Sequence, residues 1–126
     1  MRFDLVDAIL EQQTGQIVAV KSVTSAEEYL GDHFPGFPVL PGVMMLEVMV
    51  QAARKVLQKD VGPGPWVLAE VRNVRYGNMV RPGQRLRVHV ELLRQGDAGY
   101  TFTGRGTVDD QNAVQGRFIM RPLKSR

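Results

Sequence analysis

The chain has 126 residues, of which 44% are hydrophobic and 23% are charged, a composition typical of one globular domain and not of a disordered segment. The net charge of +3 suits an acidic partner but is too small to indicate nucleic-acid binding, and a chain with no cysteine and two distant histidines is not expected to hold a disulfide or a metal. The polar, acidic start and the short apolar runs predict neither a secretory signal nor a membrane span, so we expect a cytoplasmic protein.

The first third of the chain contains one clear strand and one stiff loop. Residues 2–11 are ambiguous between helix and strand by periodicity, whereas 16–23 (QIVAVKSV) are typical of a β-branched strand. Ser25, with Glu28 three residues later, predicts a short helical turn over 25–32. Residues 33–42 (HFPGFPVLPG) contain three prolines spaced three residues apart. Each proline fixes its own φ and favours an extended residue before it, so His33 lies at the mouth of a nearly rigid segment.

The rest of the chain predicts one long helix followed by strands. Residues 42–59 have no proline or internal glycine, and their first half is apolar all round apart from Glu47, which predicts a helix whose N-terminal part is enclosed by the protein. Strands are predicted over 66–78, 84–94, 99–109 and 113–121. The alternation in RLRVHVELL places His89 on a charged, solvent-facing side, so we do not expect it to be catalytic. The predicted fold is a single α+β domain over 1–126, with an antiparallel sheet of about six strands wrapped around one long central helix.

Two features next to the stiff loop are suited to take part in a reaction: the helix start and Glu47. No Ser, Thr, Asp or Asn lies between 33 and 42 to cap the helix, so its first N–H groups suit a ligand oxygen with partial negative charge. Glu47 lies roughly 7 Å further along the helix axis among apolar neighbours, where burial would disfavour its charged form and keep it available as a proton donor. Gln51, four residues on, has the spacing to hydrogen-bond it.

Each of these residues also has an ordinary explanation. A histidine in a proline-rich loop is usually only a loop histidine, and a buried glutamate can be satisfied by backbone donors. Together they supply a base, an acid and an oxyanion-binding site within 15 residues. That is the set needed to remove a proton next to a carbonyl and expel a leaving group.

The stretch HFPGFPVLPGVMMLEVMVQAA resembles the signature of the 3-hydroxyacyl-(acyl-carrier-protein) dehydratases of the FabZ type, which have a hotdog fold. The shared pattern is His-Phe-Pro-Gly-x-Pro-x-x-Pro-Gly-Val, then Glu, then Gln-Ala four residues later. The flanks QIVAVKSVT, VRNVRYGNMVRPGQRLRVHVELLR and GRGTVDDQNAVQGRF fit more loosely, so the resemblance covers most of the chain and makes residues 2–11 a strand. It implies dehydration of a (3R)-hydroxyacyl thioester to the trans-2-enoyl product in fatty acid or related lipid or polyketide synthesis, with no cofactor.

Carried over by position, the resemblance makes His33 the catalytic base and Glu47 the acid. It implies that the two come from opposite subunits of a homodimer with two shared sites, and it is compatible with a trimer of dimers. It assigns supporting roles as well: the N–H groups of Gly42 and Val43 bind the thioester carbonyl, the carbonyl of Val39 orients the imidazole, and Gln51 holds the carboxyl group.

Three features depart from the family pattern: Asp32 precedes His33 in place of the usual glycine, Val48 and Val50 are bulkier than usual near the acyl tunnel, and we expect the family's N-terminal helix to be missing before the first strand. The departures at the start and at Asp32 keep a catalytically silent acyl-binding or assembly module open as an alternative. A hotdog thioesterase is the other alternative, because it would also use a helix carboxylate.

Arginine is frequent in residues 70–94, and acyl carrier proteins are strongly acidic. We therefore expect Arg72, Arg75 and Arg81 to dock the carrier, although for any one of them the solvated side of a strand is the better explanation. Neither a nucleic acid nor a membrane is expected as a partner.

Overall fold

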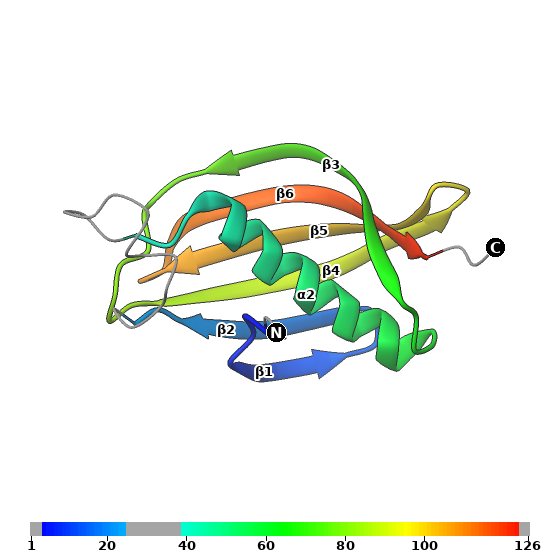
Figure 1. Cartoon of the computed structure of the whole chain (residues 1–126), viewed down its shortest axis with the longest axis horizontal. Helices are drawn as coiled ribbons and strands as arrows, with labels where there is room; N and C mark the ends of the chain where they lie inside the picture. The colour runs from blue at the N-terminus through cyan, green and yellow to red at the C-terminus, as the bar shows by residue number, and fades with distance from the viewer. Residues whose placement is uncertain (1–3, 25–38, 124–126) are drawn as a thin grey trace.

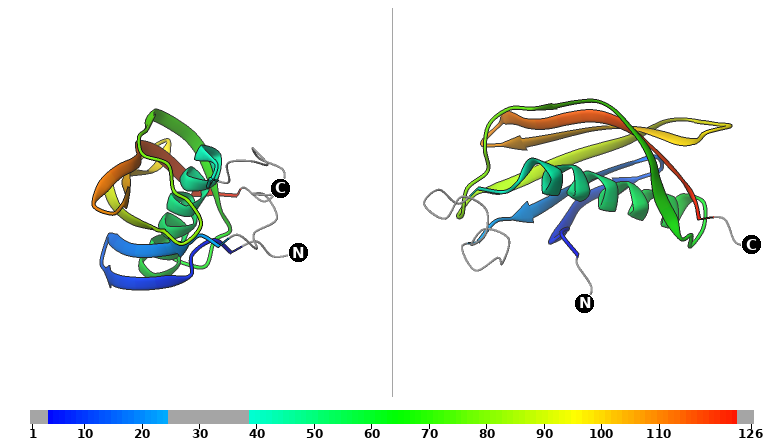
Figure 2. Two further views of the ribbon diagram at one scale, coloured as in Figure 1. Left: turned by 90° about the vertical axis from the view of Figure 1, so that its left-hand side faces the viewer. Right: turned by 45° about the horizontal axis from the view of Figure 1, so that its top comes forward.

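The computed structural model describes residues 4–24 and 39–123. In chain order this part contains β1 (Ala8–Gln13), β2 (Gln16–Ser22), α2 (Gly42–Asp60), β3 (Trp66–Tyr76), β4 (Arg85–Gly96), β5 (Gly99–Val108) and β6 (Gln111–Pro122). The strands form one antiparallel sheet in the order β1-β2-β4-β5-β6-β3. The sheet curves around α2, which lies in its concave side (Figure 1 and Figure 2). The predicted architecture, six antiparallel strands wrapped around one long helix, is confirmed.

The first strand is shorter than expected. It was predicted over 2–11, but β1 begins at Ala8. Just before it, the N–H group of Leu5 donates to the side chain of Gln51 and that of Val6 donates to Asp4. Side chains therefore occupy backbone donors that a longer strand would have used in the sheet. The helical turn predicted over 25–32 lies outside the described residues.

The hydrophobic core lies between α2 and the concave face of the sheet. The predicted alternation along β4 is confirmed, because Leu86, Val88 and Val90 are buried while the residues between them are exposed. Phe102 on β5 and Phe118 on β6 stack in this core with ring centroids 5.7 Å apart.

The N-terminal half of α2 is only partly covered by its own chain. Val43 is 67% exposed, and Met44, Leu46 and Glu47 are half-buried. The expectation that this half is enclosed by the rest of the protein is therefore wrong for the single chain. The sheet covers α2 from one side, so apolar side chains pointing elsewhere stay accessible.

The start of α2 shares one end of the molecule with the loop after β3 and the turn between β5 and β6 (Figure 1). The N–H group of Leu40 donates to the carbonyl of Val80 at 2.8 Å, which ties the segment entering the helix to the loop between β3 and β4. Both residues are buried. This end of the fold positions the candidate site.

Candidate active site

The start of α2 is uncapped by side chains, as predicted. Pro41 is the N-cap residue, it has extended backbone angles, and it makes no side-chain cap hydrogen bond. The N–H groups of Met44 and Met45 donate to its carbonyl at 3.0 and 3.1 Å. The N–H groups of Gly42 and Val43 precede these first intrahelical bonds, at the end of the helix that attracts negative charge. The arrangement suits a carbonyl oxygen that gains charge during a reaction.

The ring of Tyr76, at the end of β3, packs against this helix start. A Cβ atom on Gly42 would lie 2.9 Å from Cε1 and 3.1 Å from Cζ of the ring, so the close approach requires glycine at position 42. Tyr76 is nevertheless 52% exposed. Sequence reasoning did not single out this residue, because the contact joins distant parts of the chain and its only local signal is an aromatic residue before the turn at Gly77.

The predicted hydrogen bond between Gln51 and Glu47 is present. Nε2 of Gln51 donates to Oε2 of Glu47 at 3.1 Å, and Oε1 of Gln51 accepts from the N–H group of Leu5 at 2.7 Å. Within residues 4–24 and 39–123, no basic side chain forms an ion pair with Glu47. The carboxyl group is thus oriented by an amide that is itself fixed by the backbone ahead of β1.

Of the two remaining residues of the predicted site, the structure describes Val39 but not His33. Val39 is described and is buried just ahead of the helix. His33, the predicted base, lies outside the described residues together with its neighbour Asp32. Of the predicted set, the structure therefore brings the helix start, Glu47 and Gln51 together on α2, while the role of the Val39 carbonyl stays a prediction.

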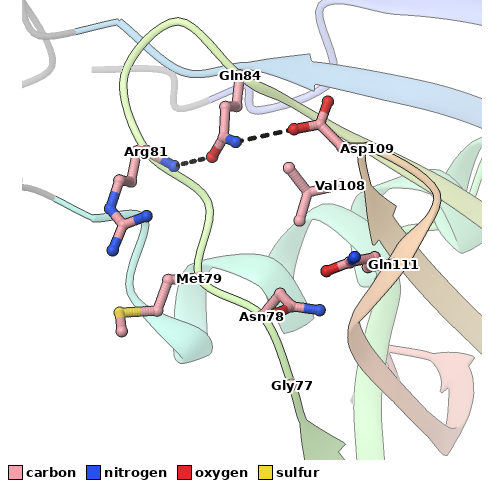
Figure 3. Close-up of a pocket in the computed structure, with 8 residues that line it drawn as sticks. All are labelled: Gly77, Asn78, Met79, Arg81, Gln84, Val108, Asp109 and Gln111. Atoms are coloured by element: carbon pink, nitrogen blue, oxygen red, sulfur yellow. Dashed lines mark hydrogen bonds between the residues drawn. The ribbon is translucent and has the colours of Figure 1, made fainter.

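A polar pocket of about 370 Å³ lies at the same end of the molecule (Figure 3). Gln84 crosses it, since its Oε1 accepts from the N–H group of Arg81 at 2.8 Å and its Nε2 donates to Oδ2 of Asp109 at 3.0 Å. The side chain of Arg81 points away from Asp109 (Figure 3). The amide of Gln84 thus links the loop between β3 and β4 to the turn between β5 and β6, beside the helix start. The pocket is lined by Gly77, Asn78, Met79, Arg81, Gln84, Val108, Asp109 and Gln111.

The three arginines predicted to dock a carrier lie in different surroundings. Arg72 is hydrogen-bonded to Glu70, and this bond together with the charge of that carboxylate raises the pKa of Arg72 above its ordinary value. Arg75 lines a pocket on the outer face of the sheet, and Arg81 lines the pocket of Figure 3. Within the described residues, Arg75 and Arg81 therefore line different pockets.

Among the described residues, no group of three His, Cys, Asp or Glu side chains is placed to hold a metal ion. No helix in that part of the chain has the length and apolar character needed to cross a membrane.

Comparison with known proteins gives matches over nearly the whole chain. The family described as FabA-like domain matches residues 1–117. The 3-hydroxyacyl-[acyl-carrier-protein] dehydratase FabZ of Anaeromyxobacter sp. is 36% identical over 124 residues, covering 93% of this chain and 78% of that protein. The FabZ of Lactococcus lactis subsp. cremoris is 35% identical over 116 residues, covering 90% of this chain and 81% of that protein.

Solved structures share the fold at low sequence identity. The dehydratase heterocomplex ApeI:P from Xenorhabdus doucetiae has a TM-score of 0.72 at 16% identity, covering 95% of this chain and 99% of that one. Zebra fish thioesterase superfamily member 2 has a TM-score of 0.69 at 18% identity, covering 92% of this chain and 80% of that one. These likenesses show the hotdog fold, which dehydratases and thioesterases both use.

Proposed function

The chain belongs to the FabA-like domain family and to its FabZ-type branch, and from this premise we propose that it removes water from a (3R)-hydroxyacyl group held as a thioester on an acyl carrier protein, giving the trans-2-enoyl thioester. The observation that carries the proposal is the carboxyl group of Glu47, held by Gln51 a short distance along α2 from an uncapped helix start. A cytoplasmic role in fatty acid or related lipid synthesis follows from the proposed reaction.

In the proposed mechanism, His33 accepts the proton from the carbon next to the thioester carbonyl. The negative charge that develops on the carbonyl oxygen is stabilised by the N–H groups of Gly42 and Val43. Glu47 donates a proton to the departing hydroxyl group, which leaves as water. The imidazolium of His33 then releases its proton to solvent, and the carboxylate of Glu47 takes one up, which restores both groups. The thioester itself acidifies the abstracted proton, so the mechanism uses no cofactor.

The proposal includes a homodimer in which His33 and Glu47 of one site come from different subunits. Its support is the helix-facing side of β3, an edge strand of the sheet. Leu68 and Val71 pair with the buried residues Met120 and Phe118 and therefore lie on the core side, yet they are 39% and 38% exposed. An apolar edge strand left open in this way favours cover by a second chain. Val43, beside the proposed oxyanion site, is open as well.

The proposed reaction is tested by incubating the protein with a 3-hydroxyacyl thioester of a carrier protein while following enoyl absorbance and free thiol. Enoyl product without thiol release supports dehydration. Thiol release without enoyl product would identify a thioesterase, and neither signal would identify an acyl-binding module. The Glu47→Gln variant is the internal control, because enoyl formation that does not depend on this residue would contradict the proposed acid.

A further inference from the structure

The outer face of the sheet carries a group of three arginines, Arg75, Arg105 and Arg117, which we call the outer arginine cluster. Arg75 on β3 and Arg105 on β5 are both paired with Gln115 on β6, and Arg117 is paired with Thr103. The three line one pocket of about 490 Å³ together with Asn73, Thr103, Gly104, Gln115 and Gly116. Cross-strand partners point to the same face of a sheet, so the three side chains gather on the side away from α2.

No acidic side chain forms an ion pair with any of the three arginines of the cluster in the part of the chain that the structure describes. Glu91 nevertheless lies on the same face of the sheet, where it is paired with Thr103. Arg105 has a neutral partner, since its Nε donates to Oδ1 of Asn112 at 2.6 Å. Arg117 also lies directly opposite Arg72, whose charge Glu70 neutralises. Three arginines without an ion pair on one face of the sheet are suited to bind an anionic partner.

The basic surface continues from the cluster onto β4. Arg105 also lines a second pocket, of about 350 Å³, together with Arg87, His89 and one acidic residue, Asp110. His89 is directly opposite Arg105 in the sheet, which places a titratable base beside the cluster. The basic side chains therefore span neighbouring strands from β4 to β3.

The features of this surface favour an acidic protein over a nucleic acid. Guanidinium groups form paired hydrogen bonds with carboxylates, and the Thr, Asn and Gln side chains between them add neutral partners. Among the described residues, no Phe, Tyr or Trp side chain lines either pocket, so the large rings on which bases usually stack are lacking there. Arg75 directly precedes Tyr76, which packs against Gly42, so the cluster shares the end of β3 with the proposed oxyanion site but lies on the opposite face of the sheet.

We propose that the outer arginine cluster is the docking surface for the acidic carrier protein that delivers the acyl group. This inference rests on the proposed function for the identity of the partner. It adds Arg105 and Arg117 to Arg75 and gives them more weight than Arg72, which Glu70 already neutralises, or Arg81, which lies in a different pocket.

The test measures binding of a fluorescently labelled acyl carrier protein by anisotropy at low and high salt. The test variant carries Arg75→Gln, Arg105→Gln and Arg117→Gln. The matched control changes three exposed basic residues that line neither pocket, and it carries Lys59→Gln, Arg94→Gln and Arg121→Gln. Both lose three positive charges, and circular dichroism verifies that both are folded. We expect the dissociation constant of the test variant to rise on the order of tenfold at low salt, and that of the control to stay within about twofold of wild type.

Several outcomes would overturn the inference. The first is wild-type affinity for the carrier in the test variant. The second is an equal loss of affinity in both variants, because that loss would reflect net charge alone. The third is that the wild-type protein does not bind the carrier. Binding of a single-stranded oligonucleotide that depends on the cluster, without carrier binding, would show that the partner class is wrong. Carrier binding that depends on the cluster in a protein that forms no enoyl product would leave the docking surface standing and remove the proposed reaction.

Discussion

The carboxyl group of Glu47 is held by the side chain of Gln51, and Gln51 is held in turn by the main chain at Leu5. Gln51 donates to Glu47 and accepts from the N–H group of Leu5, which is buried. Gln51 therefore has two separable functions. Its amide nitrogen orients the proposed acid, and its amide oxygen satisfies a backbone donor that would otherwise lack this partner.

Replacing Gln51 with leucine should remove both hydrogen bonds at similar side-chain volume. We expect the free energy of unfolding to fall by about 1–3 kcal/mol, because the N–H group of Leu5 loses its acceptor. We expect kcat for dehydration to fall roughly tenfold to a hundredfold with little change in KM, because the acid is no longer oriented. Urea denaturation and steady-state kinetics measure the two effects.

Gln58→Leu is the matched control, since Gln58 is exposed on the same helix. It should change neither quantity appreciably. A Gln51→Leu enzyme with the unfolding midpoint and kcat of the control would refute the role assigned to the Glu47–Gln51 pair.

At the scale of the elements, α2 and β5 approach closely because β5 has glycine where they meet. A Cβ atom on Gly104 would lie 2.7 Å from Sδ of Met49 and 3.4 Å from Cε1 of Phe118. Met49 and Phe118 are fully buried. Space for even one methyl group is therefore lacking between this strand and the helix that carries Glu47.

The Gly104→Ala variant should lose about 1–3 kcal/mol of stability through overpacking. Adding Met49→Ala should recover part of that loss, because the two side chains would compete for the same space. Gly96→Ala serves as the control, since a Cβ atom there would meet no atom within 4 Å. Equal unfolding midpoints for Gly104→Ala and Gly96→Ala in urea would show that the helix and strand are less tightly packed than described.

Local patterns in the sequence were sufficient for most elements. The proline-free stretch after Pro41 predicted α2 to within one residue of its end at Asp60, and the alternation around His89 predicted which side of β4 is exposed. Contacts between distant segments were not predictable, including the bond from Leu5 to Gln51 and the contact of Tyr76 with Gly42.

The environment of Glu47 was the main point on which the sequence was ambiguous. An apolar helix segment looks the same in sequence whether its own chain or a partner covers it. The structure shows that the single chain leaves Glu47 half-buried and Val43 open. The hydrogen bond between Gln51 and Glu47 was predicted from their spacing of four residues, which a regular helix preserves, whereas the catalytic roles of Glu47 and Gly42 were implied by the family resemblance.

For the whole molecule, the open edge at β3 is the feature that supports the proposed dimer. The proposed dimer would cover Leu68 and Val71, which are on the core side of that strand. A variant with Leu68→Lys and Val71→Lys should therefore be a folded monomer with little dehydratase activity. Sedimentation velocity gives the mass of the species and circular dichroism verifies its fold.

The control for the edge variant is Leu93→Lys with Leu123→Lys, which adds two lysines at other exposed apolar positions. It should keep the mass and activity of wild type. A monomeric wild-type protein with full activity would contradict the need for a partner chain.

The most direct test of a shared dehydratase site is a purified mixed dimer of two inactive variants. His33→Ala removes the proposed base and Glu47→Gln removes the proposed acid, so each variant alone should form almost no enoyl product. A dimer with one subunit of each kind, isolated with two different affinity tags, has one site with both groups and one with neither. We predict that it recovers about half of the wild-type turnover with a 3-hydroxyacyl carrier-protein thioester. A mixed dimer no more active than its parent variants would contradict the account.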